Sequence, residues 1–173
     1  MPARLLRDKG IAEFVAAAKQ LRGAARFGLV GAIDTANPSA ISEATVRGWV
    51  DDGVVEWWGH RADMPAVFAE ATVVVLPSYR EGLPKALLEA AASGRASVTT
   101  DVPGCHDVVR NGINGLLVPA RDGAALATAL GKLLGSSPLR TAMALASRRI
   151  AEHEFSDVAV AAETVALYHE LLR

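Results

Sequence analysis

The most constraining feature of this sequence is a short run of apolar residues, 73–76, followed by a loop and a helix-forming segment. A strand that is apolar on both faces is typical of a parallel sheet covered by helices on both sides. The loop contains Gly82, and the Ala- and Leu-rich segment after it begins near Pro84 and ends at Gly94. Proline in the first turn and glycine after the last turn are ordinary helix boundaries. We therefore expect a strand, a loop and a helix that is buried on most sides.

Two carboxylates accompany this unit: Glu81 precedes the first turn of the expected helix, and Glu89 lies in its middle. An ionised carboxylate in a buried helix is costly unless hydrogen-bond donors or cations satisfy it. The free N–H groups and the dipole at a helix N-terminus favour a bound anion. The two carboxylates can accept hydrogen bonds from hydroxyl groups, and the helix N-terminus beside them can bind an anion. One ligand class has both features: a sugar joined to a nucleotide through a diphosphate.

Strand and helix signals alternate along the rest of the chain. The expected strands are 26–33, 54–58, 73–76, 97–100 and 115–119. The expected helices are 11–22, 42–51 (with Ser42 as its N-cap), 64–71, 84–94, 106–110, 122–134, 139–153 and 156–172. This alternation implies a parallel sheet with right-handed crossovers, whose ligands bind at the carboxyl ends of the strands. We therefore expect an α/β fold: a Rossmann-like, doubly wound parallel sheet with extra C-terminal helices, as one domain over residues 1–173.

The first ten residues differ from the usual start of a doubly wound domain. A doubly wound domain normally begins with a strand, whereas Met1 is followed within a few residues by the loop-like segment 7–10. We therefore expect the chain to start after its first strand, or with only a short part of it.

Composition excludes several classes of function. With 51% hydrophobic and 21% charged residues the chain is globular, and with a formal net charge of −1 and no basic patch, nucleic acid is a poor partner. A single cysteine, Cys105, fits a reducing compartment, and it lacks the neighbours that activate a thiol. The four histidines show no metal-ligand spacing, so no metal site is expected. No segment matches a signal peptide or the ~20 apolar residues of a membrane span, so we expect a cytoplasmic protein.

Several segments, in the right order and spacing, resemble the C-terminal half of a retaining, family 4 (group 1) glycosyltransferase. They are residues 3–10, 76–84, 88–90 and 114–118. The resemblance covers essentially the whole chain and implies one half of the GT-B architecture, in which two Rossmann-like domains face each other across a cleft. Segments 37–42 and 99–105 are similar to those of bacterial enzymes that build surface polysaccharide or lipopolysaccharide on lipid carriers from UDP-sugars.

The resemblance also implies roles for individual residues. Arg4 and Lys9 correspond to the basic pair that holds the donor diphosphate and offsets charge on the leaving phosphate. Glu81 corresponds to the residue that binds hydroxyls of the transferred sugar, and with Arg4 and Lys9 it forms the expected catalytic set. Glu89 corresponds to the residue that accepts hydrogen bonds from both ribose hydroxyls. The remaining donor-binding residues are His60 near the nucleobase, Gly82 and Leu83 through backbone amides, Pro84, and Lys85.

The residues alone leave several of these roles open. Glu89 either binds ribose or is a structural carboxylate bonded to a neighbouring loop. Two readings are open for the basic residues: they contact phosphate, or they are solvated charges (Arg4, Lys9 and Lys85). For His60 the question is whether it touches the nucleobase.

The resemblance implies a hexosyltransferase that works at the cytoplasmic face of a membrane, with a nucleotide-sugar donor, a lipid-linked or polysaccharide acceptor and no metal. The family's N-terminal acceptor domain is absent from this sequence, so we expect no sugar transfer by this polypeptide alone. Two alternatives remain: a free-standing, non-catalytic nucleotide-sugar-binding module or partner subunit, and half of a GT-B epimerase. Any peripheral membrane contact is expected through the absent half. The apolar faces of the last helices are expected to favour self-association.

Overall fold

The computed structural model describes residues 1–172, and it confirms the alternation of strands and helices. The strands are β1 (Gly28–Leu29), β2 (Glu56–Trp57), β3 (Val74–Leu76), β4 (Ser97–Thr100) and β5 (Gly115–Val118). The helices are η1 (Arg7–Lys9, a 3₁₀ helix), α1 (Ile11–Gln20), α2 (Glu43–Asp51), α3 (Met64–Glu70), α4 (Lys85–Ala92), α5 (Cys105–Val108), α6 (Gly123–Leu134), α7 (Ser137–Glu154) and α8 (Asp157–Leu171).

All the strands pair in parallel, as expected, but they fall into two sheets rather than one continuous sheet. β1 pairs with β2, and the other sheet has the order β3-β4-β5. Residues 1–5 form an extended segment beside β1: the N–H of Ala3 donates to the carbonyl of Val30 at 2.9 Å, and that of Leu5 donates to Ala32 at 3.1 Å. Pro2 and Val30 form a parallel bridge. The result is a Rossmann-like parallel architecture.

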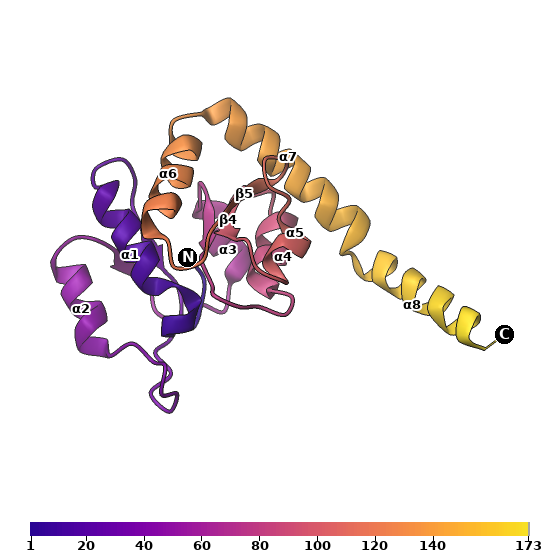
Figure 1. The fold of residues 1–173 in the computed structure, drawn as a ribbon, viewed down its shortest axis with the longest axis horizontal. Coiled ribbons are helices and arrows are strands. Elements are labelled where there is room, and N and C mark those ends of the chain that lie inside the picture. Colours follow the sequence, from indigo (N-terminus) through magenta and orange to yellow (C-terminus); the bar gives the residue numbers. More distant parts are fainter. Residues whose placement is uncertain (173) are drawn as a thin grey trace.

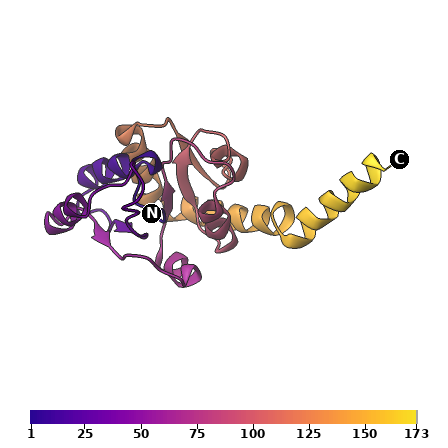
Figure 2. The same ribbon diagram turned by 90° about the horizontal axis from the view of Figure 1, so that it is seen from below.

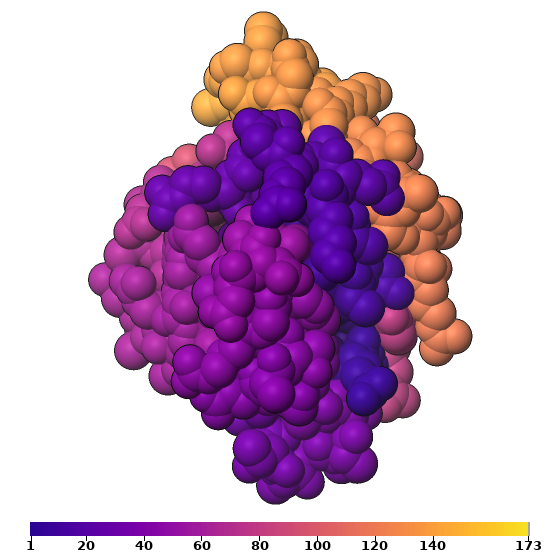
Figure 3. Space-filling view, turned by 90° about the vertical axis from the view of Figure 1, so that its left-hand side faces the viewer, coloured from indigo at the N-terminus to yellow at the C-terminus, as the bar shows by residue number. Residues whose placement is uncertain are grey.

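Helices flank the sheets, and the core lies between them (Figure 1). On one side α1 packs against α6, and on another α4 packs against α7. The largest cluster of buried side chains joins Phe14 of α1 and Leu130 of α6 to Leu29, Val75 and Val98 of the strands. Figure 3 shows the face that α1 and α2 cover, with α6 and α7 at its margin. Apolar residues of the strands are thus enclosed, as their composition predicts.

The helix boundaries follow from capping residues. Ser42 caps α2, as predicted, because its hydroxyl accepts a hydrogen bond from the N–H of Thr45 at 3.2 Å. Asp122 caps α6 in the same way, by accepting from Ala125 at 2.8 Å. These side chains satisfy backbone donors that the first helical turn leaves free.

Two strand predictions were too long: residues 26–33 and 54–58 contain only the two-residue strands β1 and β2. The chain bends after β1, where Gly31 approaches the carbonyl of Ala3 so closely that a Cβ atom would lie 1.8 Å from it. Apolar composition marks these segments as core, but the length of a ladder depends on its neighbours.

Helix α4 is buried on most sides, as expected, because it packs against α3, α5, α7, β3 and β4. Leu87, Ala90 and Ala91 are buried, whereas Lys85 and Ala92 are exposed. Helix α4 therefore presents one polar face to solvent. At the other extreme, α8 has no buried residue and extends away from the rest of the molecule in both ribbon views (Figures 1 and 2).

Candidate functional site

Three loops meet at the carboxyl ends of the strands. The loop after β3 is held to the η1 segment, because the N–H of Tyr79 donates to the carbonyl of Asp8 at 2.9 Å. The hydroxyl of Thr100, at the end of β4, donates to the carbonyl of Ser78. Ligands of open parallel sheets bind at this edge, and it is the edge at which the sequence predicts the site.

Lys9 and Glu81 form an ion pair between the η1 segment and the loop after β3. Lys9 Nζ lies 2.7 Å from Glu81 Oε1, and the side chains are only 21% and 13% exposed. They are 72 residues apart in sequence. Because an ammonium group has three donors, Lys9 has N–H groups beyond the one that it gives to Glu81. The structure thus brings together two of the three residues that the resemblance assigns to catalysis.

Tyr79 braces the loop that carries Glu81. Its hydroxyl donates to Glu13 Oε1 of α1 at 2.8 Å, and the guanidinium of Arg121 lies 4.8 Å from its ring centroid. Burial and the bond to Glu13 raise the pKa of Tyr79 to about 12, so this phenol stays protonated and continues to donate. No sequence motif marks Tyr79 for this role, because its contact with α1 exists only in the folded chain.

The N-terminus of α4 is open. Pro84 occupies the N-cap position without a side-chain hydrogen bond, and Gly82 and Leu83 before it are exposed. Pro84 itself is buried and starts the helix at the predicted point. Backbone N–H groups of an uncapped first turn point outward and favour a negative charge. This helix end, next to the pair of Lys9 and Glu81, has the features of an anion site.

A close backbone approach fixes the position of this helix end. Gly104, after β4, has φ +79°, and a Cβ there would lie 2.0 Å from the carbonyl oxygen of Gly82. Only glycine fits such a contact without displacing the loop. The sequence shows Pro103-Gly104 as a turn, but it gives no sign that this turn supports the Glu81 loop.

Glu89 is not enclosed in the core, contrary to the environment expected for it. Its side chain is 33% exposed, and its Oε1 lies 3.3 Å from Nζ of Lys85, one helical turn earlier. The Lys85 side chain is 87% exposed, so this ion pair is solvated and weak. Since α4 turns this face toward solvent, Glu89 is accessible to a ligand, and its predicted role in ribose binding stays a prediction.

Arg4 and His60 form no hydrogen bond or ion pair with Lys9 or Glu81 within residues 1–172. Arg4 pairs with Asp34 at 3.0 Å, and its side chain is 63% exposed. Arg4 and Lys9 thus have different protein partners, and their predicted role in binding the diphosphate stays a prediction. His60 is exposed in the loop after β2. That loop is tied to the end of β1 by a bond from the N–H of Gly31 to the carbonyl of Gly59 at 2.8 Å.

Three other features that could support a function are a reactive thiol, a metal cluster and a membrane-spanning helix. Cys105 is buried, and burial raises the pKa of its thiol, so it remains a protonated, unreactive thiol. No three His, Cys, Asp or Glu side chains within residues 1–172 form a cluster that could hold a metal ion. No helix in this range combines the length and the apolar character that crossing a membrane requires.

Comparison with known proteins gives consistent matches. The family model described as "Glycosyl transferases group 1" matches residues 1–136. The N,N'-diacetylbacillosaminyl-diphospho-undecaprenol alpha-1,3-N-acetylgalactosaminyltransferase of Campylobacter jejuni is 36% identical over 144 residues, which are 83% of this chain and 37% of that protein. The capsular polysaccharide biosynthesis glycosyltransferase CapM of Staphylococcus aureus is 28% identical over 173 residues, which are 98% of this chain and 45% of that protein.

A solved structure confirms the fold. Anabaena HepE, crystallised in complex with UDP, superposes with a TM-score of 0.87 at 22% identity, over 97% of this chain and 47% of that chain. The chain thus spans less than half the length of each of these relatives. From the match of the family model to most of its residues, this chain belongs to the group 1 glycosyl transferases.

Proposed function

We propose that this chain is the donor-binding half of a retaining glycosyltransferase, and that its donor is a UDP-sugar. The observation that carries the proposal is the Lys9–Glu81 pair beside the open N-terminus of α4. The N–H groups of that helix end and the remaining donors of Lys9 bind the diphosphate. The second oxygen of Glu81 accepts a hydrogen bond from a hydroxyl of the transferred sugar.

The chemistry that this arrangement supports depends on charge and position. Cleavage of the bond between sugar and diphosphate builds negative charge on the phosphate oxygen that leaves. Fixed positive potential from Lys9 and the helix dipole stabilises that charge more than it stabilises the ground state. Retention of configuration requires the acceptor hydroxyl to approach on the face from which the diphosphate leaves, so orientation of the donor replaces a protein nucleophile. No metal is needed in this scheme.

The relatives support the choice of substrates. The Campylobacter protein is named for transfer of N-acetylgalactosamine to a diphospho-undecaprenol acceptor, CapM for capsular polysaccharide, and HepE was crystallised with UDP. For this chain we infer transfer of a hexosyl residue to a lipid-linked or polysaccharide acceptor in envelope polysaccharide or lipopolysaccharide synthesis. Arg4, His60 and Glu89 complete the proposed donor site, with Glu89 at the ribose and His60 near the base.

A second candidate is a donor-binding module that does not catalyse transfer by itself. It is supported by the Lys9–Glu81 pair and the open N-terminus of α4, which can bind a nucleotide-sugar without an acceptor site. In this case the same residues bind the nucleotide-sugar, and a partner supplies the acceptor site.

Calorimetric titration of the purified chain with UDP, GDP and ADP tests the shared donor site. We expect UDP to bind at least several-fold more tightly than the other two. Equal affinities would remove the preference for uridine, and no binding of any of the three would remove the nucleotide site. A turnover assay with UDP-glucose or UDP-N-acetylgalactosamine and a lipid-linked acceptor tests the second candidate. The isolated chain is expected to bind the donor without transferring the sugar, and transfer would exclude the non-catalytic module.

A further inference from the structure

A histidine and an aspartate form a pair at the carboxyl end of β4. Nδ1 of His106 lies 2.8 Å from Oδ1 of Asp101, the first residue after that strand. The two side chains are 41% and 63% exposed, so the pair adds little to the stability of the fold. Neither residue is part of the proposed donor site.

The turn that precedes His106 packs against the Glu81 loop. At Gly104, a Cβ atom would lie 2.0 Å from the carbonyl oxygen of Gly82 and 2.9 Å from that of Glu81. The N–H of Gly104 donates to Oδ2 of Asp107 at 3.0 Å, and this bond fixes the start of α5. Because His106 lies in the first turn of α5, its position depends on the same contact that supports the Glu81 loop.

The residue before His106 senses the charges of the donor site. Cys105 is buried; burial raises the pKa of its thiol, and the charges of Glu81 and Lys9 act on it as well. Helix α5 also contacts α4, whose N-terminus is part of the donor site. His106 itself is exposed. Its ring therefore lies at the surface beside the Glu81 loop, where it can contact a sugar that Glu81 binds.

The partner of His106 determines which ring nitrogen is free. An ionised carboxylate only accepts hydrogen bonds, so Asp101 requires a proton on Nδ1 of His106. In a neutral imidazole this leaves Nε2 without a proton, as a hydrogen-bond acceptor. Within residues 1–172, Nε2 has no hydrogen-bond partner. The pair thus offers an oriented acceptor atom to a hydroxyl group.

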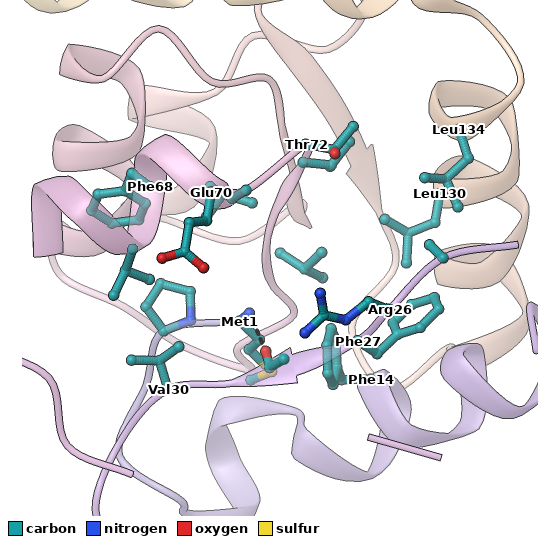
Figure 4. A pocket seen from close by; sticks show the side chains of 18 of the residues that line it. Met1, Phe14, Arg26, Phe27, Val30, Phe68, Glu70, Thr72, Leu130 and Leu134 are labelled. Carbon is teal, nitrogen blue, oxygen red and sulfur yellow. Dashed lines mark hydrogen bonds between the residues drawn. The ribbon is translucent and has the colours of Figure 1, made fainter. Parts of the chain in front are cut away.

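The pair lies outside the cavity of about 530 Å³ between β1 and β3 (Figure 4). That cavity is lined by residues that precede the two strands, such as Arg26 and Thr72, and by no residue of the donor site. A ligand that reaches His106 therefore shares the open carboxyl edge of the sheet with the donor, and it does not occupy this cavity.

We propose that His106 is a further donor-site residue, whose Nε2 accepts a hydrogen bond from a hydroxyl group of the transferred sugar while Asp101 positions the ring. This inference rests on the proposed function, because it requires a nucleotide-sugar on the Lys9–Glu81 pair. Glu81 accepts from one hydroxyl group and His106 from another. Acceptors in two fixed positions discriminate between hexoses whose hydroxyl groups differ in position or orientation, so His106 contributes to the choice of sugar.

Calorimetric titration with UDP and UDP-hexoses tests this contact. The probes are UDP-glucose, UDP-galactose and their N-acetyl counterparts, and each affinity is compared with that for UDP as a ratio. We expect at least one UDP-hexose to bind the wild type more tightly than UDP. His106→Phe keeps a ring but removes the acceptor, and it should lower that ratio about three- to tenfold while UDP affinity stays within about twofold. His169→Phe on the projecting helix α8 is the matched control and should change neither value.

Failure of this inference differs from failure of the proposed function. An unchanged ratio in His106→Phe, or an equal loss of affinity for UDP and UDP-hexose, would overturn the contact with the sugar. A wild type that binds UDP but no UDP-hexose more tightly would overturn it too. In these three cases the nucleotide site stands. If the wild type bound neither UDP nor a UDP-hexose, the proposed function would fail, and this inference with it.

The positioning role of Asp101 has a spectroscopic readout. NMR spectra of the chain with isotope-labelled histidine, recorded at about pH 8, report which ring nitrogen carries the proton. We expect His106 to carry it on Nδ1, and its Nε2 resonance to shift with UDP-hexose but not with UDP. Asp101→Ala should move the proton to Nε2 and lower the affinity ratio as His106→Phe does. If the proton and the ratio are unchanged in Asp101→Ala, Asp101 does not position the ring and that part of the proposal is wrong.

Discussion

Lys9 and Glu81 are the pair of residues on which the proposed donor site depends. Their ion pair is mostly shielded from solvent, with side chains 21% and 13% exposed, so loss of one partner leaves the other charge poorly solvated. We expect Lys9→Met to lower the free energy of unfolding by about 1–3 kcal/mol, measured by urea denaturation. The double variant Lys9→Met/Glu81→Gln should recover part of this loss, since it removes the unpaired charge.

An exposed pair in the same chain provides the control. Arg47 and Glu43 form an ion pair on α2 with side chains 66% and 54% exposed, and Arg47→Met is expected to cost less than about 0.5 kcal/mol. A similar cost for Lys9→Met and Arg47→Met would show that the Lys9–Glu81 pair is no more than a surface contact.

Glu89 tests the nucleotide end of the site. We expect Glu89→Ala to weaken UDP binding at least tenfold in calorimetric titrations, because the ribose hydroxyls lose their acceptor. The control is Glu152→Ala, which breaks another i,i+4 pair, that of Arg148 and Glu152 on α7. Equal UDP affinity in the wild type and Glu89→Ala would exclude Glu89 from ribose binding.

The Met1 amino group gives a pH dependence with a definite sign. Its pKa is lowered from 8.0 to about 5 in the folded chain, so between these values the unfolded chain binds a proton that the folded chain does not. Stability therefore rises as the pH increases from about 5 to about 8. Because N-terminal acetylation removes this group and leaves the histidines unchanged, the acetylated chain should show a smaller rise in thermal midpoint. Identical pH profiles would mean that the amino group is solvated in the folded chain.

At the level of secondary structure, local signals predicted the helices better than the strands. Ser42, the predicted N-cap, determines where α2 begins, and α6 begins directly after Asp122, the first residue of the expected helix 122–134. The strand predictions for 26–33 and 54–58 were too long because their ends depend on which neighbour pairs with them.

The candidate site was predicted chiefly through resemblance. Composition and spacing alone do not show that Lys9 meets Glu81, since 72 residues separate them. The burial expected for Glu89 was wrong, because α4 turns that face to solvent. The bond from Tyr79 to Glu13 and the contact of Gly104 with Gly82 arise only from tertiary packing. The roles of these residues in binding remain predictions.

The turn at Gly104 supports a prediction about the Glu81 loop. A methyl group at Gly104 would lie 2.0 Å from the carbonyl oxygen of Gly82 and 2.9 Å from that of Glu81, so Gly104→Ala must displace the loop. Gly112 has the same φ of +79° but no atom within 4 Å of such a methyl group. We expect Gly112→Ala to cost about 1 kcal/mol, measured by thermal unfolding, and Gly104→Ala to cost clearly more and to weaken UDP binding. Equal effects of the two substitutions would show that the close contact does not position the loop.

At the scale of the whole molecule, the exposed apolar surface is concentrated on α8. Its exposed side chains include Val158 at 80%, Leu167 at 54% and Leu171 at 72%. None of its residues is buried, and the helix projects from the domain (Figure 2). Exposed apolar surface of this kind favours association. Removal of α8 would leave the buried core unchanged, because none of its residues is part of that core.

Truncation after Ser156 separates these two effects. We expect the truncated chain to keep its thermal midpoint within a few degrees, because the buried clusters lie in earlier elements. Sedimentation velocity should show concentration-dependent association of the full chain and a monomer after truncation. A full-length variant with Val158, Leu167 and Leu171 changed to Lys controls for the loss of the helix itself, and it should also sediment as a monomer. If the unaltered chain sediments as a monomer at high concentration, α8 does not drive self-association, and its apolar residues need another explanation.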